Sequence, residues 1–219
     1  MIRGALLIAL AALLWATTGI VAKFLFSGSD LQAVTLGFLR LAVALPFFFG
    51  LMLREQRALA RSATSPPKFT RKALVPLVAL GFFQAVYQGS YLLAVDMTGA
   101  GIATLIALCL APVLVAIMAA PLLGEKPGVV TMLALAAAIA GTAMLVISDM
   151  DSAGHLRRGG IRVAVLAALV YAGFTLTSRY TSTGTPVFTT AFICFFTAAL
   201  ILLPVVALSG GFDGLQSLG

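Results

Sequence analysis

Seven long apolar stretches follow one another along the chain and constrain its fold more than any other feature. They lie near residues 4–26, 31–53, 73–95, 100–122, 128–147, 160–181 and 186–208. A helix needs about 20 mainly apolar residues to cross the hydrocarbon core of a bilayer. The stretches are too continuous for barrel strands, which alternate apolar and polar residues. The sequence therefore predicts an all-α integral membrane protein, a polytopic helix bundle with seven spans.

The composition excludes the other broad classes of protein. Hydrophobic residues make up 61% of the 219 residues and charged residues 10%, whereas soluble domains have about 45–50% and 25%. A soluble fold of this size could not bury so much apolar surface, and a disordered chain would be far more polar. The lipid bilayer is therefore the predicted surrounding of the chain.

The net charge of +7 indicates the orientation of the chain in the membrane. If the N-terminus lies inside, the inner face carries nine basic residues against Glu55 and Glu125, while the outer face carries four against five acidic residues. The nine inner residues are Arg3, Arg54, Arg57, Arg61, Lys68, Arg71, Lys72, Lys126 and Arg179. The positive charge thus predicts a cytoplasmic N-terminus, and no nucleic-acid partner is expected.

The first and sixth stretches resemble each other when the chain is shifted by 156 residues. Trp15-Ala16 then overlays Tyr171-Ala172, and Lys23 overlays Arg179. A repeat unit of five spans is odd in number, so its second copy must cross the membrane in the opposite direction. We expect inverted-topology five-helix repeats, with residues 1–150 as the first and residues 156–219 as a partial second repeat of two helices. A complete second copy would hold three more spans, so the sequence is expected to be a fragment.

Four polar residues in the third stretch predict a binding cavity. Gln84, Tyr87, Gln88 and Tyr91 follow the spacing i, i+3, i+4, i+7 and share one helix face. Amides donate and accept hydrogen bonds, and phenol rings give flat apolar contact, so together they suit an amphipathic solute. The alternative is that these groups only hydrogen-bond neighbouring helices.

Other candidate substrate-binding residues lie in the first, second and sixth stretches. Trp15 and Thr18 are placed by the repeat opposite Tyr171, although threonines also bond their own helix and aromatic rings also pack. Arg40 lies within the second stretch. One explanation is a structural role, in which Arg40 snorkels or pairs with a neighbouring helix. The more specific alternative is that Arg40 binds a substrate carboxylate.

Nothing in the sequence indicates an enzyme. HExxH and GxSxG motifs and paired intramembrane carboxylates are absent, and the single histidine, His155, lies in a polar loop. Cys109 and Cys194 lie within apolar stretches, where free cysteines behave as small hydrophobic residues. We expect no catalytic residue, no metal site and no cofactor, and the sequence gives no oligomeric state. With no acidic residue near the middle of a span, proton coupling stays open beside facilitated diffusion and exchange.

Several short segments resemble the EamA family of the drug/metabolite transporter superfamily. They are Leu13-Leu14-Trp15-Ala16 through Lys23, Phe38-Leu39-Arg40-Leu41-Ala42, Tyr91-Leu92-Leu93-Ala94-Val95, Pro112, Leu122-Leu123-Gly124-Glu125-Lys126-Pro127 and Gly141. The resemblance implies ten spans in two inverted repeats, cytoplasmic termini and a central cavity that opens alternately to either side. Here the chain stops after span seven.

Two functions are consistent with these observations. The first is a multi-pass transporter of the bacterial inner membrane that exports small metabolites, amino acids or related amphipathic solutes, by alternating access. The second is a non-transporting membrane fragment or scaffold module.

Overall fold

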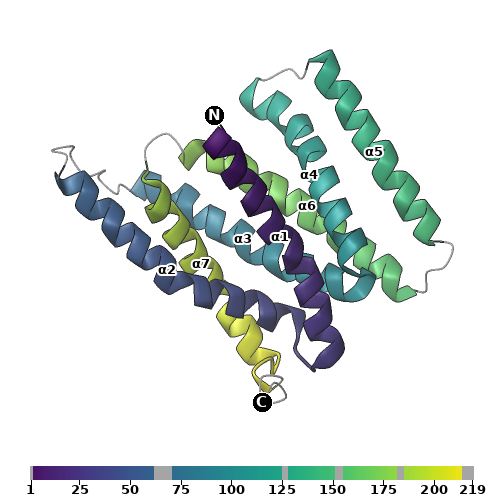
Figure 1. Cartoon of the computed structure of the whole chain (residues 1–219), viewed down its shortest axis with the longest axis horizontal. Coiled ribbons are helices and arrows are strands. Elements are labelled where there is room, and N and C mark those ends of the chain that lie inside the picture. Colours follow the sequence, from purple (N-terminus) through teal and green to yellow (C-terminus); the bar gives the residue numbers. More distant parts are fainter. Residues whose placement is uncertain (1, 62–70, 125–127, 151–154, 182–184, 214–219) are drawn as a thin grey trace.

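The chain folds into seven helices in a computed structural model that describes residues 2–61, 71–124, 128–150, 155–181 and 185–213 (Figure 1). Within these residues there is no strand. The helices are α1 (Ile2–Gly28), α2 (Ala33–Arg61), α3 (Arg71–Thr98), α4 (Ala100–Leu123), α5 (Val129–Met150), α6 (His155–Thr181) and α7 (Val187–Leu208). Six are long and apolar enough to cross a membrane, while the apolar part described in α5, Val129–Met144, is shorter. The predicted polytopic helix bundle is confirmed.

Consecutive helices run in alternating directions, so α1 and α6 run opposite to each other (Figure 1). Lys23, near the end of α1, donates a 3.0 Å hydrogen bond to the carbonyl of Asp96, near the end of α3, so these two helices are parallel. α6 is antiparallel to α3, because Gly160 at its start lies against Thr98 and Gly173 lies against Phe83. These directions agree with the expected inverted repeat; the division into two repeats remains a prediction.

α3 is the central helix, and its closest contacts depend on glycines. It packs most extensively on α6 and α7. A Cβ at Gly81 would overlap the Thr197 side chain of α7, and one at Gly173 of α6 would come within 2.9 Å of the Phe83 ring. Small residues let transmembrane helices approach closely, so these two glycines set the distances of α7 and α6 from α3.

One glycine forms the whole connection between α3 and α4. Gly99 has a φ of +89°, a backbone conformation that side-chain-bearing residues rarely adopt. It follows Thr98, the last residue of α3, and precedes Ala100, the first of α4. The turn reverses the chain in a single residue and brings α4 back along α3.

α2 and α7 lie against each other and are bonded at both ends. At one end the Glu55 carboxylate of α2 accepts hydrogen bonds from the first turn of α7. At the other end Thr35 donates to the carbonyl of Gly211 at 3.1 Å, and Gln32 donates to that of Ser209 at 3.1 Å. The four bonds fix both the register and the direction of the pair.

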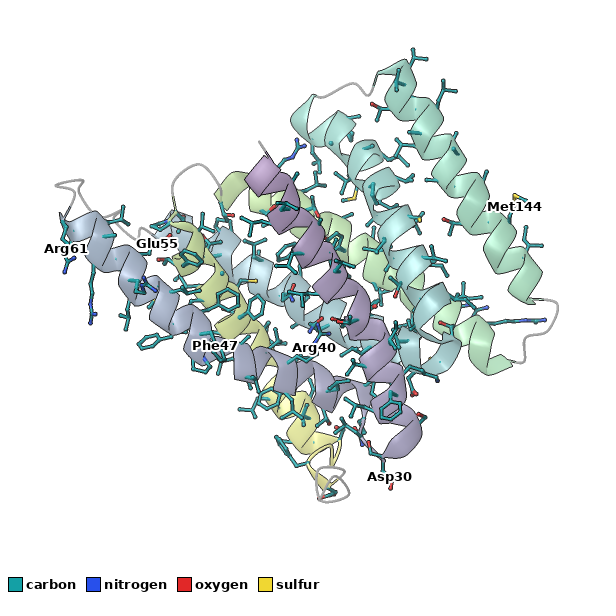
Figure 2. All side chains as sticks on the ribbon, viewed as in Figure 1. Asp30, Arg40, Phe47, Glu55, Arg61 and Met144 are labelled. Atoms are coloured by element: carbon teal, nitrogen blue, oxygen red, sulfur yellow. The ribbon has the colours of Figure 1, made fainter. Side chains whose placement is uncertain are left out.

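Large apolar side chains cover much of the surface. Phe47 of α2 is 70% exposed, and Leu7 of α1 and Val130 of α5 are exposed to a similar degree. A soluble protein rarely shows such continuous apolar patches, whereas lipid tails solvate them at no cost. Side chains of this kind project from the outer helices in Figure 2.

Candidate functional site

A cavity of about 380 Å³ opens in the middle of the bundle. Five helices, α1, α2, α3, α6 and α7, contribute its lining residues, which are Trp15, Arg40, Leu41, Ala44, Gln84, Tyr87, Gln88, Tyr171 and Phe195. Six of the eight residues predicted from the sequence are among them: Trp15, Arg40, Gln84, Tyr87, Gln88 and Tyr171. We call this space the main cavity; its volume is that of a small-molecule site.

Four aromatic rings form a continuous wall beside the main cavity. Trp15 lies 5.9 Å from Tyr171 between ring centroids, Tyr171 lies 5.2 Å from Tyr87, and Tyr87 stacks on Tyr91 at 5.6 Å. Trp15 and Tyr171 are the two residues that the predicted repeat overlays on each other. Their rings are in contact, while the division into two repeats stays a prediction.

The polar groups of the third helix fall into two kinds. Within the described part of the chain, the side chains of Gln84, Tyr87 and Gln88 make no hydrogen bond, although Gln88 is only 5% exposed. Buried polar groups usually have a partner. Hydrogen bonds between helices therefore do not explain these three side chains, and they are available to a solute or to water in the main cavity.

Tyr91 shares a helix face with Gln84, Tyr87 and Gln88, here called the polar stripe of α3, but it does not line the main cavity. It lines a separate space of about 190 Å³ together with Ala12, Trp15, Tyr87, Thr104 and Leu108. Its hydroxyl and that of Thr104 are 2.8 Å apart and share a hydrogen bond. Gly19 of α1 covers this pair, since a Cβ there would lie 3.1 Å from the Tyr91 hydroxyl. Here the bond between helices, the alternative interpretation of the stripe, is the one that is observed.

Thr18 lies next to Arg40 in a third space, of about 250 Å³, between α1 and α2. Arg40 Nη2 donates to the Thr18 hydroxyl at 3.5 Å. Arg40 lines both this space and the main cavity, and thus connects the two. The neighbouring Thr17 and, on α6, Thr175 donate to carbonyls of their own helices, as threonines within helices commonly do.

A space of about 520 Å³ lies among α4, α5 and α6 and was not predicted from the sequence. Its lining includes Pro112, Thr131, Thr175 and Arg179, and it shares Tyr171 with the main cavity. Leu41, Ala44 and Phe195 of the main cavity were also missed, because apolar residues in an apolar helix give no signal. Glu125, Lys126 and Pro127, which belong to a segment that resembles the EamA family, lie outside the described residues.

Comparison with known proteins identifies the family. The EamA-like transporter family matches residues 2–147, which is more than half of the chain. Searches of the curated proteins and of the solved structures gave no significant match. The resemblance seen in the sequence motifs is thus confirmed, and the helical bundle agrees with a membrane transporter of the drug/metabolite type. The chain belongs to the EamA-like transporter family.

Proposed function

We propose that the chain exports small metabolites across the bacterial inner membrane, with its N-terminus in the cytoplasm. The proposed solutes are amino acids or related amphipathic molecules, bound in the main cavity and released by alternating access. The observation that carries this proposal is the convergence of Trp15, Arg40, Gln84, Tyr87, Gln88 and Tyr171 on one space.

The chemistry of the cavity supports an amphipathic solute. Gln84 and Gln88 offer donors and acceptors, while the rings of Trp15, Tyr87 and Tyr171 offer flat apolar surface. Thr18 and Tyr91 border it from the two adjoining spaces. A site with both kinds of group favours molecules that have a polar end and an apolar body over simple ions or fully apolar compounds.

The arrangement of the helices supports alternating access. α1 and α6 run in opposite directions and meet at Trp15 and Tyr171 beside the cavity. Transporters with inverted repeats bind their solute at the interface between the repeats, near the middle of the membrane. The lining of the main cavity comes from α1, α2 and α3 of the first proposed repeat and from α6 and α7 of the second, which supports a site between the two.

Counterflow in proteoliposomes tests the function. The full chain is reconstituted, loaded with unlabelled phenylalanine or leucine, and supplied with the labelled amino acid outside. We expect uptake above empty liposomes, reduced about tenfold or more in Gln88→Ala because the solute loses a buried hydrogen-bonding partner. Phe47→Ala, at an exposed position on α2, is the control and should transport normally. No uptake of either amino acid, in the proteoliposomes or as efflux from cells, would favour the non-transporting module instead.

A further inference from the structure

Arg40 is a cation inside the bundle and has no counter-ion among the described residues. Its Nη1 atom is buried and makes no hydrogen bond with any described residue, and its Nη2 reaches only the Thr18 hydroxyl, at 3.5 Å. Figure 2 shows Arg40 in the middle of the bundle, whereas Asp30, Glu55 and Arg61 lie at helix ends. Burial of an unpaired charge is costly in a membrane protein, so this position requires an explanation.

The usual structural roles do not provide one. A snorkelling arginine extends its head group to the interface, but Nη1 is enclosed among the helices. A pairing arginine has a carboxylate beside it, and no ion pair of Arg40 is found among the described residues. The acidic residues with described side chains are Asp30, Glu55, Asp96 and Asp213; none of them lines the main cavity or the space around Thr18.

Arg40 belongs to the lining of the main cavity, so its charge lies beside the space proposed for the solute. It lines the main cavity together with Gln88, Tyr87 and Trp15. A guanidinium offers two parallel N–H groups to a carboxylate, and such charge-assisted bonds are about twice as strong as neutral ones. A single arginine balances a single negative charge, so the fit is to a monocarboxylate.

We propose that Arg40, which bonds Thr18 in the adjoining space, forms the anion-binding end of the main cavity, which selects organic monocarboxylates with a flat apolar body. This inference rests on the proposed transport function and narrows its substrate class. The carboxylate is the recognised group: no described acidic residue faces the cavity to pair with an ammonium group, and the apolar body packs against Trp15, Tyr87 and Tyr171. An acid that lacks the amino group should therefore bind at least as well as the amino acid.

Tryptophan fluorescence measures this directly, because Trp15 is the only tryptophan of the chain and lines the cavity. The full chain in detergent is titrated with 3-phenylpropionate, with its neutral analogue 3-phenylpropionamide, with phenylalanine and with the cation phenethylamine. We expect 3-phenylpropionate to bind at least about tenfold more tightly than the amide, phenylalanine to bind no more tightly than 3-phenylpropionate, and phenethylamine to bind most weakly.

Variants of Arg40 separate recognition from folding. Arg40→Gln should abolish the preference for the acid over the amide, and Arg40→Lys should keep a reduced preference, since a lysine offers a point charge without the fork. Arg57→Gln, at an exposed position of the same helix, should bind like the parent. The thermal unfolding midpoint of Arg40→Gln should equal or exceed that of the parent, whereas a structural cation would lower it.

The outcomes distinguish this inference from the proposed function. Equal binding of acid and amide, absence of binding by 3-phenylpropionate, or an acid preference that survives in Arg40→Gln would each overturn the role of Arg40. If counterflow then still depended on Gln88, the transport function would stand without the anion site. If the parent protein neither bound nor moved any of these solutes, the proposed function would fail as well.

Discussion

Glu55 of α2 and Thr189 of α7 are joined by two hydrogen bonds. The Glu55 carboxylate accepts from the Thr189 backbone N–H at 2.9 Å and from its hydroxyl at 3.1 Å, and its second oxygen accepts from the Phe188 N–H at 3.2 Å. The first N–H groups of a helix have no partner within that helix. A residue of α2 thus caps the N-terminus of α7, with a negative charge at the positive end of the helix dipole.

Removal of this cap should destabilise the pair of helices. Glu55→Ala leaves two N–H groups of α7 without an acceptor, and we expect a loss of about 1–2 kcal/mol, seen as a lower thermal unfolding midpoint in detergent. Glu55→Gln keeps one acceptor oxygen and should lose less. An unchanged midpoint in Glu55→Ala would mean that water replaces the carboxylate at this helix end.

Gly81 should not tolerate a side chain. A Cβ there would overlap Thr197 and lie 2.9 Å from the carbonyl of Cys194, so Gly81→Ala must push α3 and α7 apart. We expect a cost of about 1–3 kcal/mol in the free energy of unfolding in detergent. Gly89→Ala on the same helix is the matched control, since a Cβ there meets no atom within 4 Å. If both variants unfold alike, α3 and α7 are not in the contact described.

Variants of Tyr91 and Gln88 should show that Tyr91 contributes to helix packing and Gln88 to solute binding. Tyr91→Phe removes the hydroxyl that bonds Thr104 and should lower stability by about 0.5–1.5 kcal/mol, with counterflow largely retained. Gln88→Ala should do the reverse, because its amide has no partner among the described residues. Unfolding midpoints and counterflow are measured on both variants; a transport loss in Tyr91→Phe as large as that in Gln88→Ala would move Tyr91 into the binding site.

The orientation of the chain is testable with single cysteines. In a variant with Cys109→Ala and Cys194→Ala, Ser27→Cys at the end of α1 and Ser209→Cys just after α7 should lie on one face, and Arg57→Cys on the other. All three positions are exposed. A maleimide that cannot cross the inner membrane is added to intact cells of a strain whose outer membrane is permeable to it. It should label Ser27→Cys and Ser209→Cys and leave Arg57→Cys unlabelled. Labelling of Arg57→Cys alone would place the N-terminus outside.

The helices were predictable because a chain that crosses lipid must form its backbone hydrogen bonds within a helix, and each such helix needs a long apolar run of residues. The exact ends of the helices were harder to predict. α2 continues to Arg61, beyond the predicted residue 53, since Arg54 and Arg57 can extend a helix into the interfacial region. α6 likewise begins at His155 rather than at residue 160.

The site was predictable in part, for a geometric reason. Six of the eight candidate residues reach the main cavity because polar side chains in a span seldom face lipid. The stripe on α3 is nevertheless wide enough to face different neighbours. Gln84 and Gln88 line the main cavity, while Tyr91 bonds Thr104 of α4. Which neighbour each one meets depends on packing, and Phe195 and the Glu55 cap likewise depend on contacts between distant segments.

The bonds at both ends of α2 and α7 have a mechanical consequence. Glu55 fastens the pair at one end, and Thr35 and Gln32 fasten it at the other, so the two helices can neither splay nor slide without breaking hydrogen bonds. The two helices therefore form a single rigid unit that contributes Arg40, Leu41, Ala44 and Phe195 to the main cavity. Any motion that uncovers the cavity must therefore move α2 and α7 as one unit or displace the other lining helices, among which α1 is the least tightly packed.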